Sequence, residues 1–125
     1  MSAKNKKQFG IWMDSQQAII VGREQLDSGK FVVLAHEKNP GQGSNSSENA
    51  ANNAERMLQQ KFFKEISSHM QNAEELHVTG TGQAQERFIK YMADTPQFKN
   101  TVTKESTSKE MSENKLLAYI TNTFH

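Results

Sequence analysis

The sequence predicts an α/β domain built on a mixed five-stranded sheet, with helices on both faces. Segments with strand-like and helix-like patterns follow one another as β-β-β-α-β-α-β-α, and the first two strand-like segments are apolar on both faces. Strands joined by short turns pair antiparallel, whereas strands separated by helices need crossover connections and run parallel. The strand order 3-2-1-4-5, with strand 2 antiparallel to its neighbours, satisfies every connection without crossing loops.

The first three strands are expected to form an antiparallel meander. Residues 8–13 alternate between two apolar faces, as in a strand that is covered on both sides. Asp14 starts a turn, because its side chain accepts hydrogen bonds from the backbone two residues on. The β-branched run 18–21 is the second strand, and 31–35 is the third, after a turn over 26–30.

A polar segment separates the third strand from a long helix. Residues 39–49 contain Pro, Gly, Gln, Ser and Asn but no large apolar residue, which predicts a mobile, exposed loop. From about Ala50 to about Met70, apolar residues recur at helical spacing and predict an amphipathic helix. We expect one of Phe62 and Phe63 to be partly exposed, because adjacent residues diverge by about 100° around a helix. The apolar stripe consists of Ala54, Met57, Leu58, Phe62, Ile66 and Met70.

The rest of the chain alternates between strands and helices. Residues 75–79 are a short strand, the turn 80–82 leads directly into a helix, and 101–103 form the last strand before a C-terminal helix. This arrangement is the layout of ribonuclease H-like three-layer domains. The apolar positions of the two helices are Ala84, Phe88, Ile89, Met92, Leu116, Leu117, Ile120 and Phe124.

Length and composition limit the possible functions. A chain of 125 residues fits one domain, which we place at 8–125 after a flexible basic tail at 1–7. A net charge of +1 gives no strong field for steering toward nucleic acid, so any RNA contact must be local. There are no cysteines, no signal-peptide pattern and no run of about 18 apolar residues. We therefore expect a soluble cytoplasmic protein with no membrane partner.

Several kinds of chemistry find little support in the residues. The four histidines have no metal-ligand spacing, so neither a metal nor another cofactor is expected. A two-metal nuclease needs several converging carboxylates, yet Asp14 is the one acid near the first strand and is better explained by its turn. The aromatic residues Phe9, Trp12, Phe62 and Phe63 have the spacing of core positions rather than of a base-stacking platform.

Two stretches of the sequence carry a resemblance to a known family. Residues 9–21, FGIWMDSQQAIIV, contain a Trp-x-Asp turn between two strands, and residues 76–88, LHVTGTGQAQERF, contain a strand, a Gly-x-Gly turn and a helix. Both resemble small bacterial proteins related to the middle domain of the eukaryotic and archaeal-type peptide-chain release factor and Pelota. Thr81 stands where that family has a proline, and Gln85 stands where it has a lysine.

The resemblance implies a stand-alone middle domain with a ribonuclease H-like fold. In the release factors a catalytic Gly-Gly-Gln sits in a loop before a long helix, and this chain has Pro40-Gly41-Gln42-Gly43 in a comparable place. Gln42 is thus the candidate catalytic residue, since a glutamine can orient the water that attacks peptidyl-tRNA. Pro40 replaces the first glycine and fixes φ, so the alternative is a simple Gly/Ser/Asn linker.

RNA or phosphate binding is a second candidate role for the glycine-rich segments. In the turn, Gly80, Thr81 and Gly82 precede a helix whose N-terminal N–H groups attract anions, and Gln85 follows in its first turn. The alternative is a tight strand-to-helix turn in which Gly82 or Thr81 caps the helix. The neutral Gln85 favours that alternative, because it cannot neutralise phosphate charge. In the loop, the corresponding candidates are Gly41 and Gly43.

Three functions follow from these observations. The leading one is a noncatalytic accessory factor in translation that associates with the ribosome, tRNA or other RNA. The second is a peptidyl-tRNA hydrolase that acts through the Gly41-Gln42-Gly43 loop. The third is a protein-interaction domain without an RNA partner, which forms a homodimer through an edge strand of the sheet.

Overall fold

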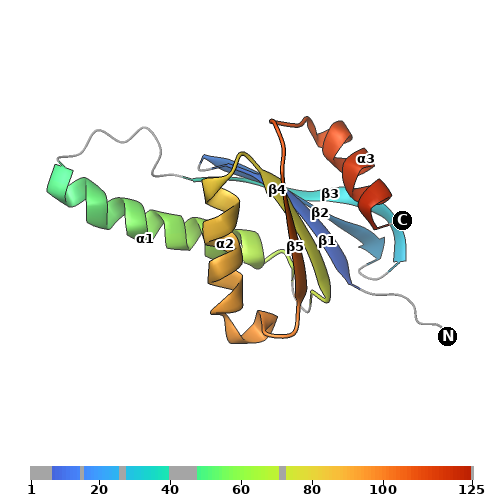
Figure 1. The fold of residues 1–125 in the computed structure, drawn as a ribbon, viewed down its shortest axis with the longest axis horizontal. Coiled ribbons are helices and arrows are strands. Elements are labelled where there is room, and N and C mark those ends of the chain that lie inside the picture. The colour runs from blue at the N-terminus through green and yellow to red at the C-terminus, as the bar shows by residue number, and fades with distance from the viewer. Residues whose placement is uncertain (1–6, 15, 26–27, 40–47, 71–72, 125) are drawn as a thin grey trace.

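The computed structural model describes residues 7–14, 16–25, 28–39, 48–70 and 73–124. These residues form the predicted succession of strands and helices, with a short 3₁₀ helix before the last strand (Figure 1). The elements are β1 Gln8–Met13, β2 Gln17–Gln25, β3 Ser28–Lys38, α1 Glu48–Ser67, β4 Glu75–Gly80, α2 Gln83–Ala93, η1 Pro96–Phe98, β5 Val102–Thr107 and α3 Glu113–Thr123.

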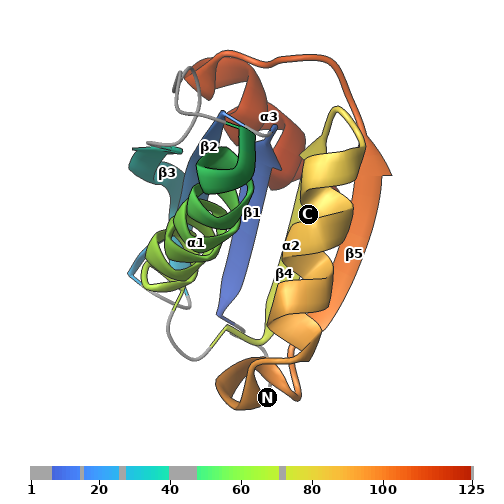
Figure 2. The ribbon, with the colours of Figure 1, turned by 90° about the vertical axis from the view of Figure 1, so that its left-hand side faces the viewer.

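The strands form one sheet in the order β3-β2-β1-β4-β5, which confirms the predicted topology. β2 pairs antiparallel with β1 and β3, whereas β4 pairs parallel with β1 and β5. α1 and α2 cover one face of the sheet and α3 covers the other, so the domain has three layers (Figure 2). β3 and β5 lie at the two edges of the sheet. A homodimer through either edge stays a prediction.

Asp14 is the hairpin-turn residue that the sequence predicts. Its Oδ1 accepts hydrogen bonds from the backbone N–H groups of Gln16, at 2.8 Å, and Gln17, at 2.9 Å. The carboxylate therefore satisfies two backbone donors where β1 turns into β2.

An apolar cluster on each face of the sheet holds the layers together. Ile11 packs on the α1–α2 face with Phe62 and Phe88, and Trp12 packs on the α3 face with Leu116. All of these side chains are almost fully buried. The indole Nε1–H of Trp12 also donates to the backbone oxygen of Lys109 at 3.0 Å, which fixes the segment before α3. β1 is therefore covered on both sides, as its sequence predicts.

Gly10 allows α3 to lie close to β1. A Cβ atom at Gly10 would lie 2.4 Å from both Cγ1 and Cδ1 of Ile120, closer than side-chain atoms pack. Because glycine has no Cβ, Ile120 fits directly against the backbone of the central strand. The glycine in the otherwise apolar run 8–13 thus has a packing role.

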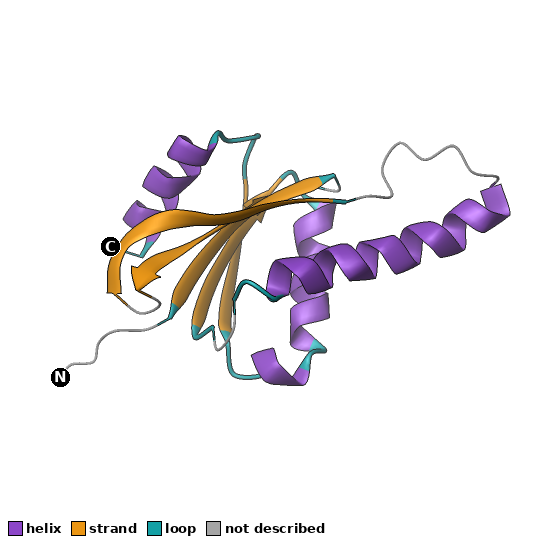
Figure 3. Cartoon of the chain, turned by 180° about the vertical axis from the view of Figure 1, so that it is seen from behind, coloured by secondary structure: helices purple, strands orange, loops and turns teal. Residues whose placement is uncertain are grey.

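Helix α1 differs from the expectation in three respects. It begins at Glu48 rather than about Ala50, so residues 48 and 49 of the predicted loop are helical, and it ends at Ser67 rather than about Met70. Its N-terminal part extends beyond the sheet (Figure 3). Met57 is 73% exposed, although it belongs to the predicted apolar stripe.

The expectation that one residue of the Phe62–Phe63 pair is partly exposed is wrong. Both side chains are buried, because α2 lies beside α1 and covers the flank of the helix that carries Phe63. The ring of Phe63 contacts the ring of Phe88 edge-on, at a centroid distance of 5.4 Å. A second helix on the same face therefore widens the buried stripe beyond what the spacing within α1 indicates.

Three strands are longer than predicted, because the backbone ladder continues into polar residues. β2 and β3 extend to Gln17–Gln25 and Ser28–Lys38, and β5 continues to Thr107 because it pairs with β4 as far as Gly80. Lys7, the last residue of the predicted tail, donates its backbone N–H to the Glu74 carboxylate at 2.9 Å. None of the helices among the described residues has both the length and the hydrophobicity needed to cross a membrane.

Candidate functional site

The loop that carries the predicted catalytic glutamine lies outside the described residues. Gly41, Gln42 and Gly43 all fall in the segment 40–47, so their catalytic or RNA-binding roles stay predictions of the sequence. The structure does describe the backbone on both sides of this segment. Segment 40–47 thus lies between the end of β3 and the start of α1, which is the position that the resemblance implies for the catalytic loop.

The turn between β4 and α2 has a backbone that only glycine fits easily. A Cβ atom at Gly80 would lie 2.0 Å from the backbone oxygen of Met13 in β1, so a side chain there would push the strands apart. Gly82 has φ +138° and caps the N-terminus of α2. Thr81, between them, is exposed. The predicted capping role of Gly82 is confirmed.

Gln85 lies inside the protein rather than on its surface. Its side chain is 0% exposed, and its Oε1 accepts a hydrogen bond from the backbone N–H of Gly82 at 2.9 Å. Its Nε2 donates to the backbone oxygen of Ser106 in β5 at 2.5 Å. The amide thus links the turn to the neighbouring strand and uses the Gly82 N–H group that a phosphate would need. This geometry favours the structural alternative for the turn, and phosphate binding there stays a prediction.

A groove between α1 and α2 brings together residues that the sequence analysis does not single out. It has a volume of about 350 Å³ and is lined by Gln59 and Gln60 of α1 and by Arg87, Lys90 and Tyr91 of α2. Arg87 and Lys90 are exposed, whereas Tyr91 is partly buried against the ring of Phe63. The groove therefore combines two cations, two amides and the aromatic rings of Phe63 and Tyr91 with the carboxylate of Asp94.

A signal for this groove is present in the sequence. Arg87, Lys90 and Tyr91 are spaced at i, i+3 and i+4, which places them on one face of a helix. Gln59 and Gln60, in contrast, belong to a helix that the chain reaches before β4, and only the packing of α1 beside α2 brings them near. The pairing of helices on one sheet face cannot be read from the spacing within either helix.

A buried histidine on the other face of the sheet forms a second polar cluster. His77 in β4 is 8% exposed, and its Nε2 lies 2.9 Å from Oγ of Ser106 and 3.2 Å from the hydroxyl of Tyr119. The two hydroxyl groups also contact each other, at 2.8 Å. Nδ1 of His77 is buried and has no hydrogen-bond partner among the described residues. A serine–histidine–carboxylate triad is thus not formed, since nothing described orients the imidazole from Nδ1.

We expect acidification to destabilise the protein through His77. Burial, and to a lesser extent the positive charge of Lys104, lowers the pKa of His77 below its usual value of 6.5. As the pH falls below about 6.5, His77 is protonated in the unfolded chain, whereas in the folded protein it is protonated only at a lower pH. The free energy of unfolding should therefore fall as the pH drops below about 6.5.

Urea denaturation at about pH 7.5 and about pH 5.5 measures this loss of stability. The acid-induced loss should be smaller in His77→Gln than in the wild type, because glutamine does not titrate. The control variant His36→Gln alters an exposed histidine in β3 and should keep the full loss. Equal losses in His77→Gln and the wild type would contradict the prediction.

Solved structures with the same fold were found over most of the chain. The Pelota protein of Thermoplasma acidophilum aligns with a TM-score of 0.56 and 16% identity, over 92% of this chain and 31% of Pelota. The Pelota protein of Archaeoglobus fulgidus gives a TM-score of 0.56 and 14% identity, over 97% of this chain and 35% of that protein. The chain has the fold of one part of Pelota.

An archaeal translation termination factor, aRF1, shows the same similarity. It aligns with a TM-score of 0.53 and 15% identity, over 85% of this chain and 31% of aRF1. At these identities the likeness to Pelota and aRF1 is one of fold, and the chain spans about a third of the length of each protein. No protein-family model and no curated protein sequence matches the chain.

Proposed function

We propose that this protein is a noncatalytic accessory factor in translation that binds the ribosome through RNA. The observation that carries the proposal is the fold, which is shared with Pelota and with aRF1 over most of the chain. Fold does not determine function by itself, so the proposal also needs a surface that suits RNA. The groove between α1 and α2 provides such a surface.

The chemistry of the groove suits an RNA backbone. Arg87 and Lys90 are exposed on the same face of α2 and are positioned to contact phosphates, and Gln59 and Gln60 offer amides across the groove. Tyr91 lines the groove with a partly buried aromatic ring, on which an unpaired base can stack. Asp94 also lines the groove and offsets one of its positive charges. We infer that the contact is local and of moderate affinity, in keeping with the net charge of +1.

The noncatalytic part of the proposal rests on the sequence of the loop. Pro40 stands where the release factors have their first glycine, and Gly43 follows the glutamine. The fixed φ of proline removes freedom that a catalytic Gly-Gly-Gln uses. The alternative, a peptidyl-tRNA hydrolase acting through Gln42, depends on a loop that lies outside the described residues and stays a prediction.

Cosedimentation with purified ribosomes tests the proposal and the groove together. The double variant Arg87→Gln/Lys90→Gln should bind ribosomes on the order of tenfold more weakly, because two phosphate contacts are lost. The dependence of log affinity on log salt should become shallower by about 2, roughly one for each lost contact. Binding measured at several salt concentrations gives both quantities.

The matched control is the double variant Lys104→Gln/Lys115→Gln. It makes the same change in net charge at two exposed lysines of β5 and α3, away from the groove, and should bind as the wild type does. If the two double variants lose the same affinity, the groove is not the contact. If the wild type does not cosediment at all, the proposed function is wrong.

A further inference from the structure

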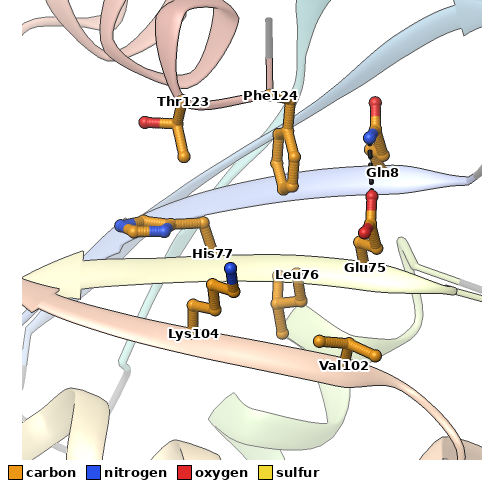
Figure 4. A pocket seen from close by; sticks show the side chains of 8 residues that line it. All are labelled: Gln8, Glu75, Leu76, His77, Val102, Lys104, Thr123 and Phe124. Atoms are coloured by element: carbon orange, nitrogen blue, oxygen red, sulfur yellow. Dashed lines mark hydrogen bonds between the residues drawn. The ribbon is translucent and has the colours of Figure 1, made fainter.

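A second pocket lies on the α3 face of the sheet, where the parallel strands begin. It has a volume of about 290 Å³, close to the lower limit for sites that bind small molecules. Figure 4 shows strand side chains on one side of it and the end of α3 on the other. The residues that matter here are Gln8, Glu75, His77, Val102, Lys104 and Phe124.

The hydrogen bonds of His77 leave one nitrogen of its ring unmatched. Two hydroxyl groups, from Ser106 and Tyr119, contact Nε2 and each other. One of them can donate a hydrogen bond to Nε2 while the other donates to the first hydroxyl. With Nε2 as the acceptor, the neutral imidazole carries its proton on Nδ1. Nδ1 is buried without a partner among the described residues, although such groups normally have one.

The charges around the pocket indicate what kind of partner would suit this donor. Lys104 lines the pocket beside His77 and is exposed, so its ammonium group is accessible to a ligand. Glu75 also lines the pocket, and its Oε1 accepts a hydrogen bond from Nε2 of Gln8 at 2.6 Å. One cation and one carboxylate in the same pocket favour a monoanion over a doubly charged phosphate.

The remaining surface of the pocket is apolar. Val102, in the edge strand β5, is 54% exposed, and the ring of Phe124 lies across the pocket from the strands (Figure 4). Both side chains would lose contact with water if a ligand occupied the space between them. The ligand is therefore expected to have an apolar body next to its charged group.

We propose that this pocket binds a small carboxylic acid with an apolar body, whose carboxylate contacts Lys104 and the Nδ1–H group of His77. Nδ1 is buried, so the contact requires a side-chain movement at the pocket wall. Thr123 is exposed at the C-terminal end of α3, where helices commonly fray, and is suited to this movement. The proposal does not depend on RNA binding, because the pocket and the α1–α2 groove lie on opposite faces of the sheet.

NMR titration of the full chain with benzoate tests the proposal. The imidazole nitrogens of His77 and the backbone amides of Thr123 and Phe124 should show saturable shifts with benzoate. Benzamide has the same shape without the charge, and inorganic phosphate has charge without an apolar body. Both should bind more weakly, and the Lys104→Gln variant should lose benzoate affinity on the order of tenfold.

The control variant is Lys64→Gln, which removes an exposed lysine of α1 on the opposite face and should bind benzoate like the wild type. Lys104 is exposed, so its replacement should leave the fold intact, and the unshifted amides in the same spectra check this directly. Equal binding of benzoate and benzamide would show that the pocket does not recognise the carboxylate charge. Tighter binding of phosphate than of benzoate would show that the ligand needs no apolar body. The absence of a saturable shift with benzoate would show that the pocket does not bind small carboxylic acids.

Discussion

The Gly80→Ala substitution should lower the free energy of unfolding by about 3 kcal/mol or more, the upper end of what overpacking one methyl group costs. The new Cβ would lie 2.0 Å from the backbone oxygen of Met13 and 2.6 Å from Oε1 of Gln85. The first contact is with the backbone of the central strand, which cannot move without breaking its ladder with β2 or β4. Urea denaturation followed by circular dichroism measures the change.

Two other residues of the same turn separate the steric effect from its alternatives. Thr81→Ala changes an exposed side chain and should stay within about 0.5 kcal/mol of the wild type. Gly82→Ala places its Cβ where no atom lies within 4 Å, so its cost comes from φ +138° alone and should be about 1–3 kcal/mol. If Gly80→Ala is as stable as Thr81→Ala, the close approach of the two strands is not as described.

Gln85→Lys, which introduces the residue found in the resembling family, should destabilise the protein by about 3 kcal/mol. The side chain at this position is 0% exposed, and a lysine there would have to bury its ammonium group or lose its proton. Lysine also has no acceptor for the N–H group of Gly82, which Gln85 satisfies at 2.9 Å. The measurement is again the free energy of unfolding in urea.

The control is Gln83→Lys, the same change two residues earlier on α2, at an exposed position. It should stay within about 0.5 kcal/mol of the wild type. Should Gln85→Lys prove as stable as Gln83→Lys, position 85 can turn toward solvent. The turn would then be open to phosphate, and the binding role that the sequence suggests for Gly80, Thr81 and Gly82 would regain support.

The sequence predicts the topology well because its signals are local. Each strand or turn has a signal within its own segment, such as the two apolar faces of residues 8–13, the turn at Asp14 and the glycines at 80 and 82. Only one strand order connects these elements without crossing loops, and it is the observed one. The failures come from contacts between distant segments. Met57 follows the helical spacing of a buried residue but is 73% exposed. The spacing within α1 does not show that the N-terminal part of the helix extends beyond the sheet.

The candidate sites depend even more on distant contacts. From the sequence, Gln85 is a neutral residue in place of a surface lysine. In the structure it is buried, and its amide donates to the backbone oxygen of Ser106 in β5. His77 is a single histidine in a strand, and its two hydroxyl partners come from β5 and α3. The residues around Gln85 and His77 in the sequence do not predict these partners. The partners come from other strands and helices, and the packing of the whole domain determines which of them lie close.

The central position of β1 has a consequence for how the chain folds. One edge of this strand pairs with β2 through a short turn, but its other edge pairs with β4, and Gln8 and Glu75 are 67 positions apart. Its α3 face is completed by Ile120, which lies against Gly10. Contacts between such distant positions slow folding, because the connecting chain must be ordered before they form. We therefore expect slow, cooperative folding in which the first hairpin gains its stability only when the last helix docks.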